Sequence, residues 1–280
     1  MASATAAVRP DWRAPAHVVA FCTTRAGGVS EPPYDSLNLG LHVGDDPVRV
    51  RENRQRLVDA LALPSTPAWL AQVHGTRVVR IGTPGRRAAG GAVSGEAGGA
   101  GASGASESAR DGAIEADGAW SDEPSRVIGV LTADCLPVVV TDAAGSRVAV
   151  AHAGWRGLAG GVLAEALVPF AADGELHAWL GPAIGSRAFE VGDDVRDAFV
   201  RRDPAHEAAF VARERPGKYL ADIYALARHE LVRSRPDGAV HVAGGDRCTV
   251  TEATRFHSHR RDGARSGRMA TLAWLAVGSA

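Results

Sequence analysis

Short runs of β-branched and apolar residues alternate along the chain with longer stretches in which apolar residues recur at helical spacing. The short runs predict strands at 17–24, 71–81, 147–151, 176–180 and 239–243, and two more on either side of a polar bend within 127–140. The longer stretches predict helices at 47–63, 158–170, 191–201 and 220–233. This alternation predicts an α/β fold, with some α+β character, in which helices flank a mixed central sheet.

Two segments show neither pattern. Residues 1–12 are predicted to be disordered, and they lack the apolar core of a signal peptide. Residues 82–113 consist almost only of Gly, Ala, Ser and charged residues, so they cannot bury enough apolar surface to offset their ordering entropy. We therefore expect a flexible insertion within one catalytic domain at 13–280, because strand-like sequence resumes directly after it.

Composition and net charge argue against two classes of binding partner, nucleic acids and membranes. Hydrophobic residues make up 45% and charged residues 22% of the 280, as is typical of a globular protein. The net charge of −1 gives no basic field, and no apolar run could span a bilayer, so we expect no nucleic-acid and no membrane partner. Three cysteines, Cys22, Cys135 and Cys248, make no disulfide framework, which favours the reducing cytoplasm. No oligomeric state is predicted.

Two histidines and one cysteine stand at three different strand ends: His74, Cys135 and His152. Their spacings of 61 (135 − 74) and 17 (152 − 135) residues form no zinc-finger pattern, but strand ends can meet at one edge of a sheet. Two imidazoles and a thiolate suit Zn²⁺ and leave a fourth position open, and Cu²⁺ is the alternative metal. Spacing alone also allows a structural histidine with a core cysteine, or a metal-free Cys–His nucleophile pair.

Other polar residues near these positions are candidates for anion binding or proton transfer. Asp134 could orient a ligand or take a proton. Arg156 follows a glycine turn that opens a helix, a pattern that favours anions, although the glycines equally suit close packing. Arg25 lies beside two glycines, and the C-terminal region adds His257, His259, Arg260 and Arg261. This last group could bind metal or phosphate, or could simply be solvated.

Several longer motifs occur together and in a fixed order. They are TTRAGGVSEPPYDSLNLGLHVGDDP, QVHG, ADG, TADCLPV, AHAGWRG, GPAIG, FEVGDDV and SHRRDGARSGRM. As a set they resemble the laccase-domain family, whose members have also been called multicopper polyphenol oxidases, peptidoglycan editing factors and purine nucleoside phosphorylases. The resemblance runs from about Val18 to Leu275, and the Gly/Ala-rich insertion departs from it.

The resemblance implies a single α/β domain with a zinc-like catalytic site. By motif, its ligands correspond to His74, Cys135 and His152. It also implies phosphorolysis of adenosine, inosine, guanosine and methylthioadenosine, together with adenosine deamination. Residues of the TRAGG and SLNLGLH motifs would line the substrate pocket, namely Arg25, Asn38 and His42.

The implied reactions require groups beyond the metal ligands. Deamination needs an acid/base group near an activated water, and Asp134 is the candidate. Phosphorolysis needs a clamp for phosphate, and the sequence does not choose among the candidates Arg25, Arg156 and Arg260.

Three alternatives remain open at this point. A copper-dependent polyphenol oxidase (laccase) would need several His-x-His pairs and fits poorly, because the chain has one such pair and one methionine, Met269, besides the initiator. A cysteine or zinc hydrolase could edit mis-incorporated serine in peptidoglycan precursors. A binding module without catalysis is least favoured, because the polar motifs lie at several strand ends.

Overall fold

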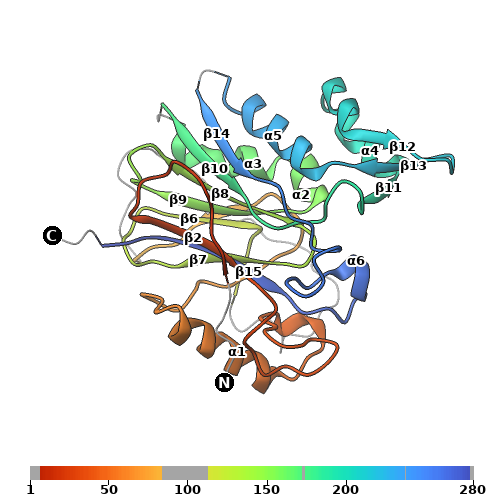
Figure 1. The fold of residues 1–280 in the computed structure, drawn as a ribbon. Helices are drawn as coiled ribbons and strands as arrows, with labels where there is room; N and C mark the ends of the chain where they lie inside the picture. Colours follow the sequence, from red (N-terminus) through yellow and green to blue (C-terminus); the bar gives the residue numbers. More distant parts are fainter. Residues whose placement is uncertain (1–6, 84–112, 172–173, 237, 278–280) are drawn as a thin grey trace.

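Two β-sheets form the centre of the computed structural model, which describes residues 7–83, 113–171, 174–236 and 238–277 (Figure 1). The first sheet is antiparallel, in the order β1 (Ala7–Val8), β2 (Val18–Thr23), β15 (Met269–Leu275), β7 (Ile128–Thr132). The second is mixed, in the order β14 (Val240–Gly244), β10 (Leu176–Leu180), β8 (Leu136–Asp142), β9 (Val148–Ala153), β6 (Gly118–Ser121), β4 (Val78–Arg80). The predicted α/β class with a mixed sheet is confirmed, and the antiparallel sheet is added to it.

Alternation of side chains along the strands assigns each sheet face to a different core. In β8, Val138 and Val140 join a core under helices, whereas Val139 joins a core between the two sheets. The helical layer on the mixed sheet consists of α2 (Trp155–Gly160), α3 (Val162–Leu167) and α5 (Ile223–Arg233). On the outer face of the antiparallel sheet lies α1 (Pro47–Ala60), which buries Leu57 against Phe21 and Leu272. The layers are therefore helix, sheet, sheet and helix.

Smaller elements complete the fold. Two short strands pair in parallel, β3 (Leu70–Ala71) and β5 (Ile114–Glu115). A separate three-stranded sheet consists of β11 (Glu190–Gly192), β13 (Lys218–Ala221) and β12 (Phe210–Ala212). The other helices among the described residues are α4 (Asp193–Val200), α6 (His259–Asp262) and the 3₁₀ helices Leu41–Val43, Val168–Phe170 and Pro204–Ala209.

Several predicted elements have different limits in the structure. The predicted helix 158–170 is divided at Gly161, whose φ of 105° no continuous helix can contain. The predicted strand 71–81 is interrupted at His74, which has a φ of 61°. The first residues of the predicted helices 191–201 and 220–233 belong instead to the strands β11 and β13, and the helices begin after them. The two strands within 127–140 are confirmed as β7 and β8.

The two segments predicted to be disordered or flexible are only partly within the described residues. Ala7 and Val8 pair with Thr23 and Cys22 as β1, so the prediction of disorder over 1–12 is corrected there. Val8 and Trp12 pack against the core between the sheets, and this burial offsets the entropy of ordering. Residues 1–6 and 84–112 lie outside the described residues. No described helix has the length and apolarity that crossing a membrane requires.

Candidate metal centre

The three predicted ligands meet at one point. The ligand atoms of His74, Cys135 and His152 all lie within 4.8 Å of one another. The Cys135 Sγ is 3.8 Å from the His74 Nε2, and the two imidazole rings cross at 71° with their centroids 4.8 Å apart. Within the described ranges, no other group of three His, Cys, Asp or Glu side chains is close enough to hold a metal ion.

The β8–β9 hairpin places two of these residues. Pro137 of β8 stands opposite His152 of β9, so Cys135, just before β8, reaches the same end of the pair. Asp134 turns the chain into β8 with a φ of 92°, a left-handed conformation that is strained for a residue other than glycine. The bend thereby presents Cys135 at the rim of the sheet while His152 stays buried.

Asp117, directly before β6, places the third ligand, His74. Its fully buried carboxylate accepts hydrogen bonds from three successive backbone N–H groups, those of Val73, His74 and Gly75, at 3.2, 2.9 and 2.7 Å. The left-handed conformation of His74 curls the backbone so that these donors converge on one anion. The loop that carries His74 is therefore fixed by one carboxylate.

The same carboxylate orients His152. Asp117 Oδ1 lies 2.9 Å from His152 Nδ1, and the Asp117 carbonyl also accepts the His152 backbone N–H at 2.7 Å. Burial raises the pKa of Asp117, but hydrogen bonds from His152 and Gly75 outweigh this and lower it. The ionised carboxylate favours a proton on Nδ1 and leaves Nε2 of His152 for the centre.

Without a bound metal ion, the charges and hydrogen bonds around Cys135 favour its thiolate form. Burial raises the pKa of Cys135, but the His152 charge and hydrogen bonds from both histidines outweigh it and lower the pKa to about 6. Conversely, burial lowers the pKa of His152, but the Cys135 thiolate and Asp117 raise it to about 9. A thiolate is the form of cysteine that binds metals and attacks electrophiles.

Close packing around the centre requires two glycines of the HAGWRG motif. A Cβ on Gly154 would lie 2.9 Å from the Cys135 Sγ and 3.1 Å from the His74 Cδ2. A Cβ on Gly157 would lie 2.7 Å from the Gly75 carbonyl oxygen. These glycines therefore serve the close approach of α2 to the ligands and to the His74 loop.

The residues fit a zinc ion. In tetrahedral geometry, a Zn–S bond of about 2.3 Å and a Zn–N bond of about 2.0 Å hold the two ligand atoms about 3.5 Å apart. The 3.8 Å between Cys135 Sγ and His74 Nε2 is close to this value. His152 is buried, Cys135 is half-buried and His74 is exposed, so one side of the centre faces solvent and could admit a substrate.

The residues of the SLNLGLH motif lie near the centre in two different roles. Burial lowers the pKa of His42 to about 4, and the charges of Arg268, His152 and His74 add to the effect, so His42 lies within electrostatic range of the ligands. Asn38 is fully buried, and its Oδ1 accepts the backbone N–H groups of Gly40 and Arg268, both at 2.9 Å. Its amide therefore positions backbone rather than facing an open surface.

The side chains of the three predicted phosphate ligands either bind other groups of the chain or are exposed to solvent. Arg25 donates to the carbonyls of Asp35 and Ala253 and forms an ion pair with Asp35. Arg156 is exposed over the ring of its neighbour Trp155. Arg260 is exposed and donates from Nη1 to the Glu190 carbonyl at 2.9 Å.

Asp134 is connected to the C-terminal region. Its carboxylate accepts the Thr249 hydroxyl and the Arg260 backbone N–H, both at 2.6 Å. Both oxygens of the predicted acid/base group are thus already hydrogen-bonded within the chain.

The remaining candidates lie outside the centre. His257 is fully buried against Gly267, and burial lowers its pKa to about 3, whereas His259 is exposed at the start of α6. Cys22 is a core residue, where burial raises its pKa to about 12. Two important residues were not predicted, Asp117 and Arg268, although the ADG and GARSGRM motifs contain them.

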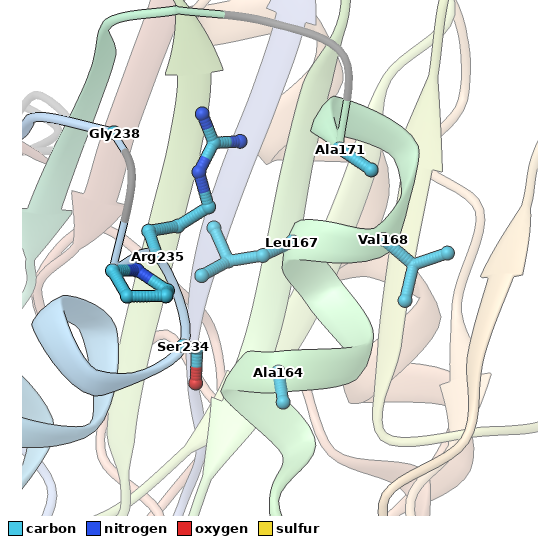
Figure 2. A pocket seen from close by; sticks show the side chains of 8 residues that line it. Ala164, Leu167, Val168, Ala171, Ser234, Arg235 and Gly238 are labelled. Atoms are coloured by element: carbon cyan, nitrogen blue, oxygen red, sulfur yellow. The ribbon is translucent and has the colours of Figure 1, made fainter.

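A hollow elsewhere on the molecule is separate from the centre. Figure 2 shows it between α3 and the segment after α5, with Leu167, Val168, Ser234 and Arg235 among its walls. Arg235 donates to the Phe170 and Gly174 carbonyls there. None of its lining residues belongs to the group at His74.

Fold and site define an α/β protein with a candidate mononuclear metal centre of two histidines and a cysteine. Residues 19–276 match the family model described as multi-copper polyphenol oxidoreductase laccase, and the chain belongs to this family. The resemblance stated from the motifs is thereby confirmed.

Similar proteins cover nearly the whole chain. Purine nucleoside phosphorylase YfiH of Escherichia coli is 49% identical over 95% of this chain and 97% of its own. Purine nucleoside phosphorylase PA4543 of Pseudomonas aeruginosa is 47% identical over the same shares. Among solved structures, NMB0706 of Neisseria meningitidis is 43% identical with a TM-score of 0.80, covering 97% of this chain and 99% of that one. YlmD of Geobacillus stearothermophilus is 30% identical with a TM-score of 0.76, over 94% and 93%.

Proposed function

We propose that the protein is a metal-dependent purine nucleoside phosphorylase that acts on adenosine, inosine, guanosine and methylthioadenosine and also deaminates adenosine. The observation that carries the proposal is the meeting of His74, Cys135 and His152 at a half-open centre. The names of relatives that are nearly half identical over almost the full length support the substrate class. Zn²⁺ is the proposed metal, because two imidazoles and a thiolate suit it.

The proposed phosphorolysis exchanges one bond for another. An oxygen of hydrogenphosphate forms a bond to C1′ of the ribose while the bond from C1′ to the purine nitrogen breaks. The bonding electron pair leaves with the purine, and the proton of hydrogenphosphate ends on that base, giving ribose 1-phosphate. When bound, zinc would supply a Lewis acid at the exposed side of the centre.

The chain's own residues would position the reactants. Asp117 fixes the His74 loop and the tautomer of His152, so the centre stays preorganised. We propose that Asp134 holds the Arg260 segment at the rim of the site, because both its oxygens already accept hydrogen bonds. His42 stays uncharged at neutral pH because burial lowers its pKa to about 4, and it is suited to contact a neutral purine or ribose.

A second candidate is a metal-free cysteine hydrolase, the editing role considered for peptidoglycan precursors. The lowered pKa of Cys135 next to His152 favours it, since a thiolate–imidazolium pair is an activated nucleophile. Copper oxidation is less favoured, because the described residues supply a single three-ligand group and a multicopper site needs several.

Product analysis tests the proposal. Zinc-loaded protein is incubated with adenosine, with and without phosphate, and the products are separated by chromatography. Adenine and ribose 1-phosphate should form only with phosphate, inosine should form in both cases, and Cys135→Ala should abolish all three. Absence of both adenine and hypoxanthine in the presence of phosphate would rule out phosphorolysis.

A further inference from the structure

Arg268 directly precedes β15 and is held by the segment around Asn38. Its backbone N–H donates to the Asn38 side chain at 2.9 Å, and its carbonyl accepts the Leu39 N–H at 3.2 Å. A Cβ on Gly40 would lie 2.7 Å from the Arg268 Cγ, so the arginine stem lies directly on the glycine backbone. These contacts fix the path of the side chain.

Sheet register brings Arg268 to the metal centre. Met269 stands opposite Thr132, the last residue of β7, so Arg268 lies at the end of the sheet where the chain turns through Asp134 to Cys135. Burial lowers the pKa of Arg268, while the negative charges of Cys135 and Asp134 oppose this. Arg268 also lowers the pKa of His42. The Arg268 guanidinium is thus within electrostatic range of Cys135 and Asp134 and also of His42.

The charge of Arg268 is not matched by an acid. Its Nη1 donates to the carbonyls of Ser266 and Gly267 at 2.7 and 3.1 Å, and no carboxylate of the described residues lies within ion-pair distance of it. In contrast, Arg25 is paired with Asp35 and Arg261 with Asp262. A half-buried guanidinium without a counter-ion is costly unless an anion completes it, and its planar fork suits phosphate.

We propose that Arg268 is the clamp for inorganic phosphate, holding it beside the His74–Cys135–His152 centre with the Nε and Nη2 edge of the guanidinium. This proposal rests on the proposed phosphorolysis and names the anion subsite that the reaction requires. Arg268 is preferred to the earlier candidates because Arg25 is paired with Asp35 and because Arg156 and Arg260 are exposed to solvent. The clamp would orient the oxygen that attacks C1′ and would reduce repulsion between phosphate and the Cys135 thiolate.

The test compares Arg268→Gln and Arg268→Lys with the wild type and with Arg201→Gln, a variant of an exposed arginine directly after α4. Binding of inorganic phosphate to the zinc-loaded proteins is measured by calorimetry, and the KM values for phosphate and for adenosine are measured separately. Arg268→Gln should weaken phosphate binding and raise the phosphate KM by about 10- to 100-fold. The adenosine KM should change by no more than about twofold, and zinc content should not change.

The lysine variant separates the role of the charge from that of the planar guanidinium. Arg268→Lys keeps a charge but not the fork, so it should fall between wild type and Arg268→Gln, and it serves if the glutamine variant does not fold. Unchanged phosphate affinity in both variants would overturn the clamp, as would a wild type that binds adenosine 5′-monophosphate but no inorganic phosphate. If the wild type binds phosphate through Arg268 but releases no adenine, the clamp stands and the phosphorylase proposal fails.

Discussion

At the residue scale, one carboxylate connects two of the three candidate ligands. Asp117 accepts the backbone N–H groups on both sides of His74 and fixes Nδ1 of His152. Partners of this kind set both the tautomer and the direction of a metal-binding histidine. The geometry of the centre should therefore depend on Asp117, although its side chain is not one of the proposed ligands.

We predict that Asp117→Asn weakens zinc binding by about 10- to 100-fold. The amide would turn a donor toward the backbone N–H groups and leave part of them unpaired, so the free energy of unfolding should also fall by about 2 kcal/mol. Zinc affinity is measured by competition with a chromophoric chelator and stability by urea unfolding. Glu115→Gln, two residues away with an exposed side chain, is the matched control and should resemble the wild type in both. Wild-type zinc affinity in Asp117→Asn would refute the positioning role.

The candidate metal ligands could be predicted from the sequence, but the residues around them that position or complement them could not. His74, Cys135 and His152 could be predicted because their residue types themselves bind metals and their motifs have a family resemblance. Asp117 escaped prediction because it acts on backbone N–H groups, which leave no pattern of side chains. Arg268 escaped prediction because the proposal for it depends on finding no carboxylate partner among the described residues, which only the folded chain reveals.

At the element scale, the β8–β9 hairpin and α2 bring the ligands together. The hairpin sets Cys135 beside His152, and α2 approaches both Cys135 and His74 at Gly154. The backbone of Gly154 has a φ of −60° and a ψ of 157°, which other residues adopt freely. Glycine is therefore required there by the space the ligands occupy and not by backbone conformation.

We predict that Gly154→Ala disrupts the centre by separating Cys135 from His74. The new methyl group would lie within 3.1 Å of both side chains, so zinc affinity should fall by at least about tenfold. Stability should fall by about 1–3 kcal/mol, as is usual for overpacking. Gly174→Ala is the control, because a Cβ there meets nothing within 4 Å. Equal zinc affinities of the two variants would show that α2 does not constrain the ligands.

Strand and helix types were predicted well where apolar periodicity was long, as in α1, β8 and β9. Limits were predicted poorly where single residues adopt left-handed conformations, as at His74 and Gly161. β15 was not predicted, although all seven of its residues are buried. Its run MATLAWL is equally compatible with a buried helix, and only pairing with β2 and β7 decides between them.

At the scale of the whole molecule, stability and the metal centre rest on different parts of the structure. The stacked sheets form the core and carry the centre at one end. A separate cluster of side chains around one buried carboxylate joins α5 to the segment after α4. Its centre is Glu230, which lies 2.7 Å from Arg233, 3.0 Å from His206 and 3.5 Å from Arg202.

We predict that Glu230→Gln lowers the free energy of unfolding by about 2 kcal/mol, because the amide cannot replace all the interactions that the buried carboxylate makes with Arg233, His206 and Arg202. Urea unfolding measures the change. Glu207→Gln breaks the exposed pair with Arg196 and should lower the stability much less, because solvent screens that pair. Zinc content should be unchanged in both variants. A Glu230→Gln protein as stable as the wild type would show that the cluster contributes nothing to stability.

The most direct test of the account is a zinc titration of the metal-free protein, with adenosine phosphorolysis measured at each step. We predict little activity without metal, a linear rise up to about one equivalent of zinc per chain, and a plateau beyond it. His74→Ala should abolish both the tight binding and the rise. Full activity in the metal-free protein, unchanged by added zinc, would contradict the account and favour the cysteine hydrolase.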